Sequence, residues 1–291
     1  MILVTGGTGT LGRELVRRLL ESGERVRVMT RERERARGLP AAAEVVVGDL
    51  ADSASLSAAV RGCRRVVSAA HGFVGPGKPT PEEVDHEGNK RLLRAAVEAN
   101  VERFVLVSVA GASADHPMSL ARAKFAAERE LRESGLRFSI VRAAPFMETW
   151  VAIMGGMLDA KGHAVVFGPG TNPVGFVSVR DVAALVVLSL RDDTTHDVCE
   201  IGGPENVGLA TVAERVIAAR GQRAPVKHIP LFALRMMSVL ARPFAPAFAR
   251  QAQAAVLMNT TDMTADPAAR PCGPGIPVTT LADVLAGSSA E

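Results

Sequence analysis

The sequence predicts an α/β protein in which helices cover both faces of one doubly wound, parallel β-sheet. Through residues 1–200, short β-branched runs alternate with amphipathic segments, which is the pattern of parallel strands joined by crossover helices. The strand runs are apolar at nearly every position, as expected for strands that are buried on both faces. We expect strands at 2–5, 25–30, 44–47, 65–68, 104–108, 137–142 and 198–201.

Helix signals separate these strands. The leucine-rich segment after the first strand is predicted to end at Gly23, which can adopt the left-handed conformation. Residues 80–83 read Thr-Pro-Glu-Glu and combine a capping threonine, a proline in the first turn and a capping-box glutamate. This motif predicts a helix that continues to Ala99. A further helix is predicted over 119–134, with Ser119 as its N-cap.

The composition argues against several classes of protein. The 291 residues are 47% apolar and carry a net charge of only +3, with arginines and acidic residues interspersed, so no nucleic-acid partner is expected. No apolar stretch reaches the roughly 20 residues of a membrane-spanning helix, and the first residues do not resemble a secretory signal. Cys63, Cys199 and Cys272 lack CxxC spacing, so we expect reduced thiols, no metal site and a cytoplasmic location.

A glycine-rich turn joins the first predicted strand to the first predicted helix. Gly6, Gly9 and Gly12 have GxxGxxG spacing, and this strand–turn–helix setting is typical of dinucleotide-binding sites. Glycines allow positive φ and close approach of the backbone, and the N–H groups that open the next helix can hold a pyrophosphate. The alternative is a turn used only for tight packing. The other cofactor contacts expected in this turn are Thr8, Thr10 and Leu11.

Arg31 follows the second predicted strand, where NAD-preferring sites usually carry an acidic residue that binds the ribose hydroxyls. A guanidinium can pair with a 2′-phosphate, which a carboxylate would repel. The sequence therefore favours NADPH as the cofactor. The alternative is that Arg31 is one surface charge in a basic loop.

Longer motifs accompany this turn. GGTGTLG at 6–12 is followed by VDHEGN at 84–89, FVLVS at 104–108, AKF at 123–125 and FVSVRDVA at 176–183. With these motifs the chain resembles the atypical short-chain dehydrogenase/reductases, especially the NmrA-like branch, which includes NADPH-dependent quinone reductases and redox-sensing regulators. The resemblance implies a Rossmann domain and covers residues 1–200 most clearly.

The resemblance also implies roles for individual residues. Asp49 and Leu50 would flank the adenine, Ala69 and Ala70 would line the nicotinamide half of the site, and Lys124 would bond the nicotinamide ribose. Without the resemblance, Asp49 could simply cap a helix and Lys124 could be a solvated lysine.

The chain departs from the family at the catalytic positions. Members that depend on a tyrosine carry it four residues before the lysine, but here that position is Leu120, and the chain contains no tyrosine. Ala110 stands where the family serine is expected, while Ser108, which we include among the cofactor contacts, lies inside the fifth strand. Asp85 occupies a position where many relatives carry an active-site asparagine. Of the usual catalytic set, Lys124 remains.

These observations predict an NADPH-dependent oxidoreductase that reduces a small apolar acceptor, such as a quinone or an enone, without a catalytic tyrosine. Lys124, His71 and His116 are the candidate catalytic residues, since both histidines follow strands at the edge where ligands gather. Two alternatives stay open. The chain could be a regulator that senses NADPH or NADP without turnover, or a non-redox cyclase or isomerase on the same fold.

The regular alternation weakens in the second half of the chain. We expect residues 1–145 to form the Rossmann domain, to which 176–203 returns, and residues 146–175 and 204–291 to form a smaller substrate-binding lobe. The residues expected to contact substrate are Phe146, Met147, Glu148 and Trp150.

Apolar residues in this lobe have more than one interpretation. Methionines and phenylalanines can enclose a flat apolar substrate, although their helical spacing is equally compatible with core packing. A homodimer interface or a membrane-surface patch around 230–255 is a third alternative, because Arg235, Arg242 and Arg250 flank the apolar residues.

Overall fold

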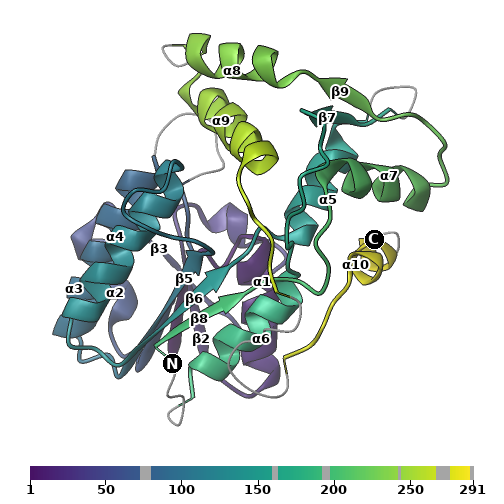
Figure 1. Cartoon of the computed structure of the whole chain (residues 1–291). Coiled ribbons are helices and arrows are strands. Elements are labelled where there is room, and N and C mark those ends of the chain that lie inside the picture. The colour runs from purple at the N-terminus through teal and green to yellow at the C-terminus, as the bar shows by residue number, and fades with distance from the viewer. Residues whose placement is uncertain (73–79, 159–162, 192–196, 242–243, 267–275, 289–291) are drawn as a thin grey trace.

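The computed structural model describes residues 1–291 except 73–79, 159–162, 192–196, 242–243, 267–275 and 289–291. Within the described ranges, seven parallel strands form one sheet in the order β3-β2-β1-β4-β5-β6-β8 (Figure 1). The order reverses between β1 and β4, the place where doubly wound sheets bind ligands at their carboxyl edge. The strands are β1 (Ile2–Thr5), β2 (Val26–Thr30), β3 (Glu44–Val47), β4 (Arg65–Ser68), β5 (Arg103–Val109), β6 (Phe138–Ala143) and β8 (Val198–Ile201).

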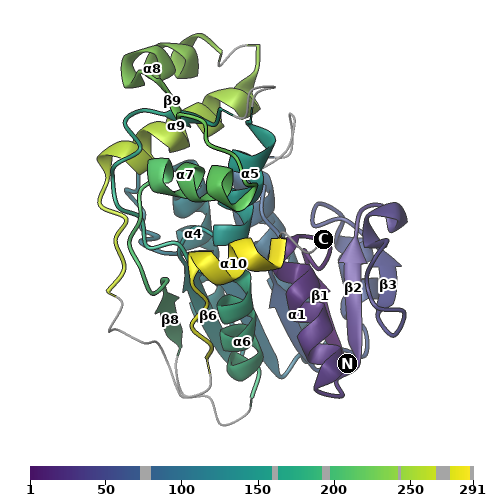
Figure 2. The same ribbon diagram turned by 90° about the vertical axis from the view of Figure 1, so that its right-hand side faces the viewer.

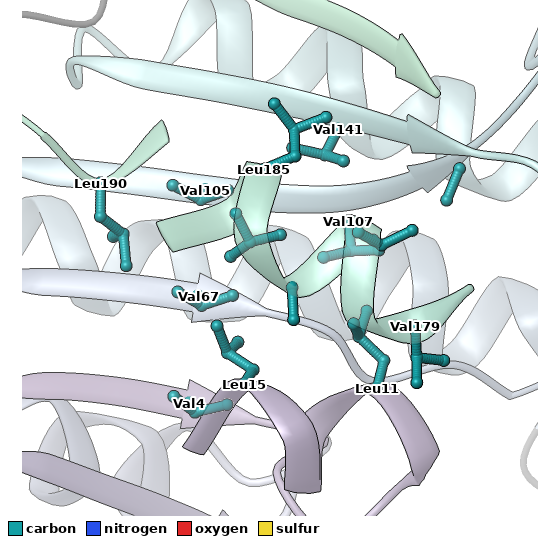
Figure 3. Close-up of a cluster of buried hydrophobic side chains, with 14 of the residues drawn as sticks. Val4, Leu11, Leu15, Val67, Val105, Val107, Val141, Val179, Leu185 and Leu190 are labelled. Atoms are coloured by element: carbon teal, nitrogen blue, oxygen red, sulfur yellow. The ribbon is translucent and has the colours of Figure 1, made fainter. Parts of the chain in front are cut away.

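Helices cover both faces of this sheet because neighbouring residues in each strand point to opposite sides. Val105 and Val107 of β5 pack toward α1 (Thr10–Glu21) and α6 (Val179–Ser189), as Figure 3 shows. Phe104 and Leu106 of the same strand belong to the opposite cluster. That second face is covered by α2 (Ser53–Val60), α3 (Asn89–Glu98) and α4 (Ser119–Glu133). The predicted doubly wound α/β fold is confirmed.

The remaining elements form a smaller group beyond the carboxyl edge of the sheet (Figures 1 and 2). A third hydrophobic cluster joins several of these helices, and a fourth, small cluster joins α8 to α9. Two short strands pair in parallel in a separate sheet that the sequence did not predict. The elements are α5 (Met147–Gly156), β7 (Val165–Phe167), α7 (Leu209–Ala219), β9 (Lys227–Ile229), α8 (Leu231–Leu240), α9 (Pro246–Thr260) and α10 (Leu281–Ser288).

The helix predicted to run to Ala99 begins as expected but is not one regular α-helix. Thr80 and Glu83 make the reciprocal bonds of a capping box, with the Thr80 amide 2.7 Å from Glu83 Oε2. A wider π-helical turn over η2 (Glu82–Gly88) then leads into α3. Hydrophobic periodicity does not distinguish a π-helical turn from an α-helical one, so the π-helical turn could not be predicted from it.

Two local expectations were wrong. Met118, not Ser119, is the N-cap of α4, because the ring of His116 accepts a bond from the Met118 amide and sets the turn before the helix. Cys199 is disulfide-bonded, whereas Cys63 is free, as expected, and is buried. Cys272 lies outside the described residues. Cysteine spacing in the sequence cannot reveal which thiols the fold brings together.

Among the described residues, no helix is both long enough and apolar enough to cross a membrane. The division into two domains at 145, 176 and 203 stays a prediction, although α6 and β8 do return to the main sheet.

Candidate cofactor-binding and active site

Two glycines of the turn after β1 are required by packing. Gly6 has a φ of +75°, and a Cβ atom added there would lie 2.5 Å from the backbone carbon of Ala69. A Cβ atom added to Gly12 would lie 2.1 Å from the Gly6 carbonyl oxygen. Any side chain at either position would therefore push α1 away from β1 and β4.

Gly9 differs from these two glycines because the protein itself leaves room for a side chain there. The nearest atom to an added Cβ is the Gly6 carbonyl oxygen at 3.4 Å, which is an ordinary contact. Gly9 is the N-cap of α1, makes no side-chain cap bond, and is followed by a first turn without acidic residues. Helix N-termini of this kind can accept an anion. Thr8 is half-buried and Thr10 exposed beside Gly9, while Leu11 is packed into the core.

Arg31 is exposed at the carboxyl end of β2, and within the described part of the chain it has no hydrogen-bond or ion-pair partner. Its neighbours are engaged, since Arg33 donates to the Val45 carbonyl oxygen and Arg35 pairs with Glu32 at 3.2 Å. Arg31 therefore has a guanidinium that is available to a phosphate at this edge.

Asp49 and Leu50 follow β3 and point in different directions. Asp49 is exposed, and its Oδ1 accepts a 2.9 Å bond from the Ala51 amide. It does not cap α2, because the N-cap is Asp52, whose side chain accepts from the Ala54 amide. Leu50 is buried in the cluster beneath α2 and α3.

Lys124 is almost fully buried and is held by two oxygens. Its Nζ lies 2.9 Å from Asp85 Oδ1 and donates a 3.1 Å bond to the Ala70 carbonyl oxygen, just beyond β4. The ammonium has three N–H donors and uses one of them in this hydrogen bond, so it can donate to a further partner. Asp85 is fully buried, and its Oδ2 accepts a 2.8 Å bond from the Gly72 amide. The Lys124–Asp85 contact is ionic, because Oδ1 has no aligned hydrogen bond.

A second polar chain holds the turn that carries Asp85. Ser68 at the end of β4 donates a 2.6 Å bond to Asn89 Oδ1, and the Asn89 amide group donates to the Asp85 carbonyl oxygen at 2.9 Å. The hydroxyl of Thr5 lies 3.4 Å from that of Ser68. The carboxyl ends of β1 and β4 are thereby linked to the π-helical turn. Sequence reasoning placed Asp85 where many relatives carry an active-site asparagine but gave it no role, and it did not include Asn89, although their spacing of four places both on one helix face.

His71 directly follows Ala70 and lies near the Lys124–Asp85 pair. Its side chain is exposed, yet the protein atoms around the ring disfavour its charged form and lower the pKa of His71 below its usual value. The Asp85 carboxylate opposes this shift, and the Lys124 ammonium adds to it. The structure thus brings together His71 and Lys124, as expected from sequence, and adds Asp85.

His116 has a local structural contact. Its Nδ1 accepts a 3.0 Å bond from the Met118 amide, and its carbonyl oxygen accepts from Arg122. The ring is half-buried in the turn that precedes α4. Nothing in its contacts joins it to Lys124.

Ser108 is buried, and its hydroxyl donates a 2.6 Å bond to Glu128 Oε1. Glu128 is also fully buried and forms a bidentate pair with Arg142, at 2.9 and 2.6 Å, with Arg132 at 3.3 Å. This carboxylate raises the pKa of the Arg142 guanidinium. The Ser108 side chain is committed to this internal network, which sequence reasoning did not foresee.

The four residues that we expected to contact substrate differ in their burial and in their contacts. Met147 is fully buried in the third cluster, and Glu148 accepts bonds from the Ser178 hydroxyl and the Val179 amide, so it caps α6. Phe146 is half-buried just before α5. Trp150 is half-buried with its ring centroid 6.2 Å from that of Phe176.

A cavity of about 720 Å³ lies between α1, α5, α6, α7 and α10. Thr10 and Glu148 line it, but neither His71 nor Lys124 does. The cavity therefore does not include the buried ion pair, and we place the candidate reaction centre at that pair on chemical grounds. No ionisable pair of comparable burial lines the cavity.

Comparison with known proteins identifies the family of the chain. Residues 6–193 match the model of a family described as NAD(P)H-binding. The chain is 31% identical over 280 residues to the (4-alkanoyl-5-oxo-2,5-dihydrofuran-3-yl)methyl phosphate reductase of Streptomyces griseus, covering 92% of this chain and 94% of that protein. It is 28% identical over 271 residues to the photosystem II assembly factor Ycf39 of Synechocystis sp., covering 91% and 82% respectively.

Among solved structures, the NADPH-dependent quinone oxidoreductase QOR2 of Escherichia coli superposes with a TM-score of 0.76 at 20% sequence identity, covering 99% of this chain and 100% of that one. This likeness confirms the fold, and the matched family confirms that the chain is of the NAD(P)H-binding kind that the resemblance implied. The chain belongs to this NAD(P)H-binding family.

Proposed function

We propose that the protein is an NADPH-dependent reductase of conjugated apolar acceptors, quinones or enones, that works without a catalytic tyrosine. The observation that carries the proposal is the pairing of Lys124 with Asp85 one helical turn after Leu120. The ribose-binding lysine of the family is retained and firmly held, while the proton-donating position is occupied by a side chain that cannot carry a proton.

The described residues fit a dinucleotide along the carboxyl edge of the sheet. In our proposal, the open N-terminus of α1 at Gly9 holds the pyrophosphate, and Arg31 pairs with the 2′-phosphate. Asp49 lies beside the adenine end, and a free N–H of Lys124 bonds the nicotinamide ribose. The remaining contacts that we propose are Gly6, Thr8, Thr10, Leu11, Gly12, Leu50, Ala69 and Ala70.

A conjugated acceptor suits this set of groups. Bound NADPH supplies hydride, and hydride addition to a quinone or an enone places negative charge on a delocalised oxygen rather than on a localised alkoxide. Such an anion needs less help from a general acid than a ketone does, and general acids are usually worth about 10² to 10⁴ in rate. His71 is the titratable group beside the ion pair, and we assign it the proton that the acceptor oxygen takes up.

The relatives support this choice of acceptor. The Streptomyces griseus enzyme is named as a reductase of an oxo-dihydrofuran that carries an alkanoyl group, and the Escherichia coli enzyme is named as a quinone oxidoreductase. The paired rings of Trp150 and Phe176, with Phe146 nearby on the chain, offer an apolar wall for such a substrate. Met147 and Glu148 act through packing and through the cap of α6.

The test is NADPH oxidation with a benzoquinone, a naphthoquinone and a cyclic enone, with a simple aliphatic ketone as the matched negative substrate. We expect turnover of the conjugated acceptors and little turnover of the ketone. Tight NADPH binding without oxidation by any acceptor would instead indicate a sensor. Product formed without consumption of NADPH would indicate a cyclase or an isomerase.

A second arm tests the cofactor assignment. Arg31→Ala is expected to weaken NADPH binding roughly 10- to 100-fold and to leave NADH binding nearly unchanged, because charge-assisted bonds are worth about 1.5–3 kcal/mol. Arg35→Ala is the control, since Arg35 belongs to the same loop but pairs with Glu32. Equal affinities of the wild type for NADPH and NADH would refute the assignment.

A further inference from the structure

Helix α8 has an unusual distribution of apolar residues. Leu234 is fully buried against Ala252 and Ala255 of α9. At 100° per residue, the side directly opposite Leu234 should be the solvent-facing side and is expected to be polar. Here that side is apolar, and its large side chains are exposed. They are Phe232, Met236, Val239 and Leu240.

A further exposed phenylalanine follows the helix. Phe244 is 89% exposed and Phe232 is 72% exposed, which are the two highest values among the large hydrophobic residues of the described chain. Figures 1 and 2 both place α8 at the extremity of the molecule, with α9 between it and the remainder of the fold. Exposed apolar groups gathered at one end of a protein usually mark an interaction surface.

The charged residues in the segment that contains this face have one sign. From Arg215 to Thr261 the sequence contains several arginines and a lysine but no aspartate or glutamate. Arg223 and Arg235 are exposed in the structure, whereas Arg242 lies outside the described residues. Basic residues beside exposed phenylalanines and leucines complement a surface of anionic lipid headgroups.

The size of the face argues against a second copy as its partner. A helix of ten residues is about 15 Å long and about 10 Å wide. A stable dimer usually buries about 800 Å² on each partner, more than one face of such a helix offers. Interfacial binding needs only that a few apolar side chains sink about 5–10 Å into the headgroup boundary. We propose that α8, together with Phe244, docks the protein onto an anionic phospholipid bilayer.

The test measures co-sedimentation of the full chain with vesicles. One set contains equal amounts of phosphatidylcholine and phosphatidylglycerol, and the other contains phosphatidylcholine alone. We expect binding to the anionic vesicles that weakens with added salt and with charge removal. The double variant Phe232→Ser and Phe244→Ser should lower the partition coefficient by about tenfold or more. Val97→Ser is the control, because Val97 is an exposed apolar residue on α3, in another part of the molecule.

Arg235→Glu separates the electrostatic contribution from the apolar one. It should weaken binding to the anionic vesicles by about fivefold or more for the lost positive charge, and leave binding to phosphatidylcholine unchanged. NADPH binding by each variant verifies that the chain is folded, since the substitutions lie far from the glycine-rich turn. The proposal is overturned if the anionic vesicles do not pellet the wild type, or if the double variant pellets equally well. It is also overturned if the wild type is a dimer in solution that the double variant converts to a monomer without any vesicle binding.

Discussion

Two fully buried carboxylates differ in how many hydrogen bonds they accept. One is Glu128, which belongs to α4, and the other is Asp85, which pairs with Lys124 of α4. Glu128 accepts bonds from Ser108, Arg132 and Arg142, so both of its oxygens are occupied by aligned donors. Asp85 contacts Lys124 and the Gly72 amide, and its Oδ1 lacks an aligned donor. An ion pair whose oxygens all accept hydrogen bonds within the protein stabilises the fold and has no free acceptor for a ligand. A pair with spare donors and acceptors, next to the exposed His71, can take part in binding and proton movement.

The largest effect that we expect tests the pair of Glu128 with Arg142. Glu128→Ala leaves Arg142 without its carboxylate, and breaking a buried pair from one side costs about 3–5 kcal/mol. The midpoint of urea unfolding should therefore fall strongly. The control is Glu102→Ala, which removes an exposed partner of Arg64 and should change the midpoint little. A Glu128 variant that unfolds at the same urea concentration as the wild type would mean that this network is not a source of stability.

The next effect tests the pair of Lys124 with Asp85. Lys124→Met removes the ammonium that we assign to the ribose, and NADPH oxidation should fall by about 100-fold because the cofactor is no longer correctly positioned. The variant also leaves Asp85 buried without a cation, which lowers stability by itself. The double variant Asp85→Asn and Lys124→Met removes both charges and should regain much of that stability without regaining activity. Recovery of activity in the double variant would show that Lys124 acts only through folding.

The smallest effect concerns pH. Because the pKa of His71 lies below its usual 6.5, the ring is protonated only on the acidic side of that value. If His71 donates a proton to the acceptor, kcat should fall as the pH rises through this lowered pKa, and His71→Asn should remove that limb of the profile. An unchanged pH profile in His71→Asn would assign the proton to water.

The lowered pKa of His71 also makes the stability of the fold depend on pH. The unfolded chain binds a proton at His71 more readily than the folded chain does, so stability attributable to this group increases with pH and is lost as the pH falls through and below 6.5. Comparing urea midpoints of the wild type and His71→Asn on both sides of this range measures that contribution.

Much of the fold could be predicted from the sequence, because it depends on local patterns. All seven strands of the main sheet were predicted within a residue of their ends, and the capping box at Thr80 and the stop of α1 before Gly23 were also foreseen. The strands β7 and β9 were not, since each has three residues and is stabilised by a partner more than 50 residues away, from Val165 to Lys227. A run of three residues is too short to show the alternation from which a strand is predicted.

The candidate site was predictable in part for the same reason. The glycine turn and Arg31 lie in one continuous segment around β1 and β2, so a cofactor-binding role for them could be predicted from residue spacing alone. The partners of Lys124 are 39 and 54 residues away, at Asp85 and Ala70, and only the packing of η2 and α4 against the end of β4 brings them together. We expected Ser108 to contact the cofactor, but in the folded chain its hydroxyl donates to Glu128, which lies 20 residues away.

The sequence by itself determined the doubly wound sheet, the glycine-rich turn and the lack of any tyrosine, because these follow from periodicity, backbone freedom and residue identity. Only the tertiary structure decided which buried charges pair, which donors stay free, and that α8 turns apolar side chains outward. Pairing and exposure depend on distances between segments that are remote along the chain, and no local pattern encodes those distances.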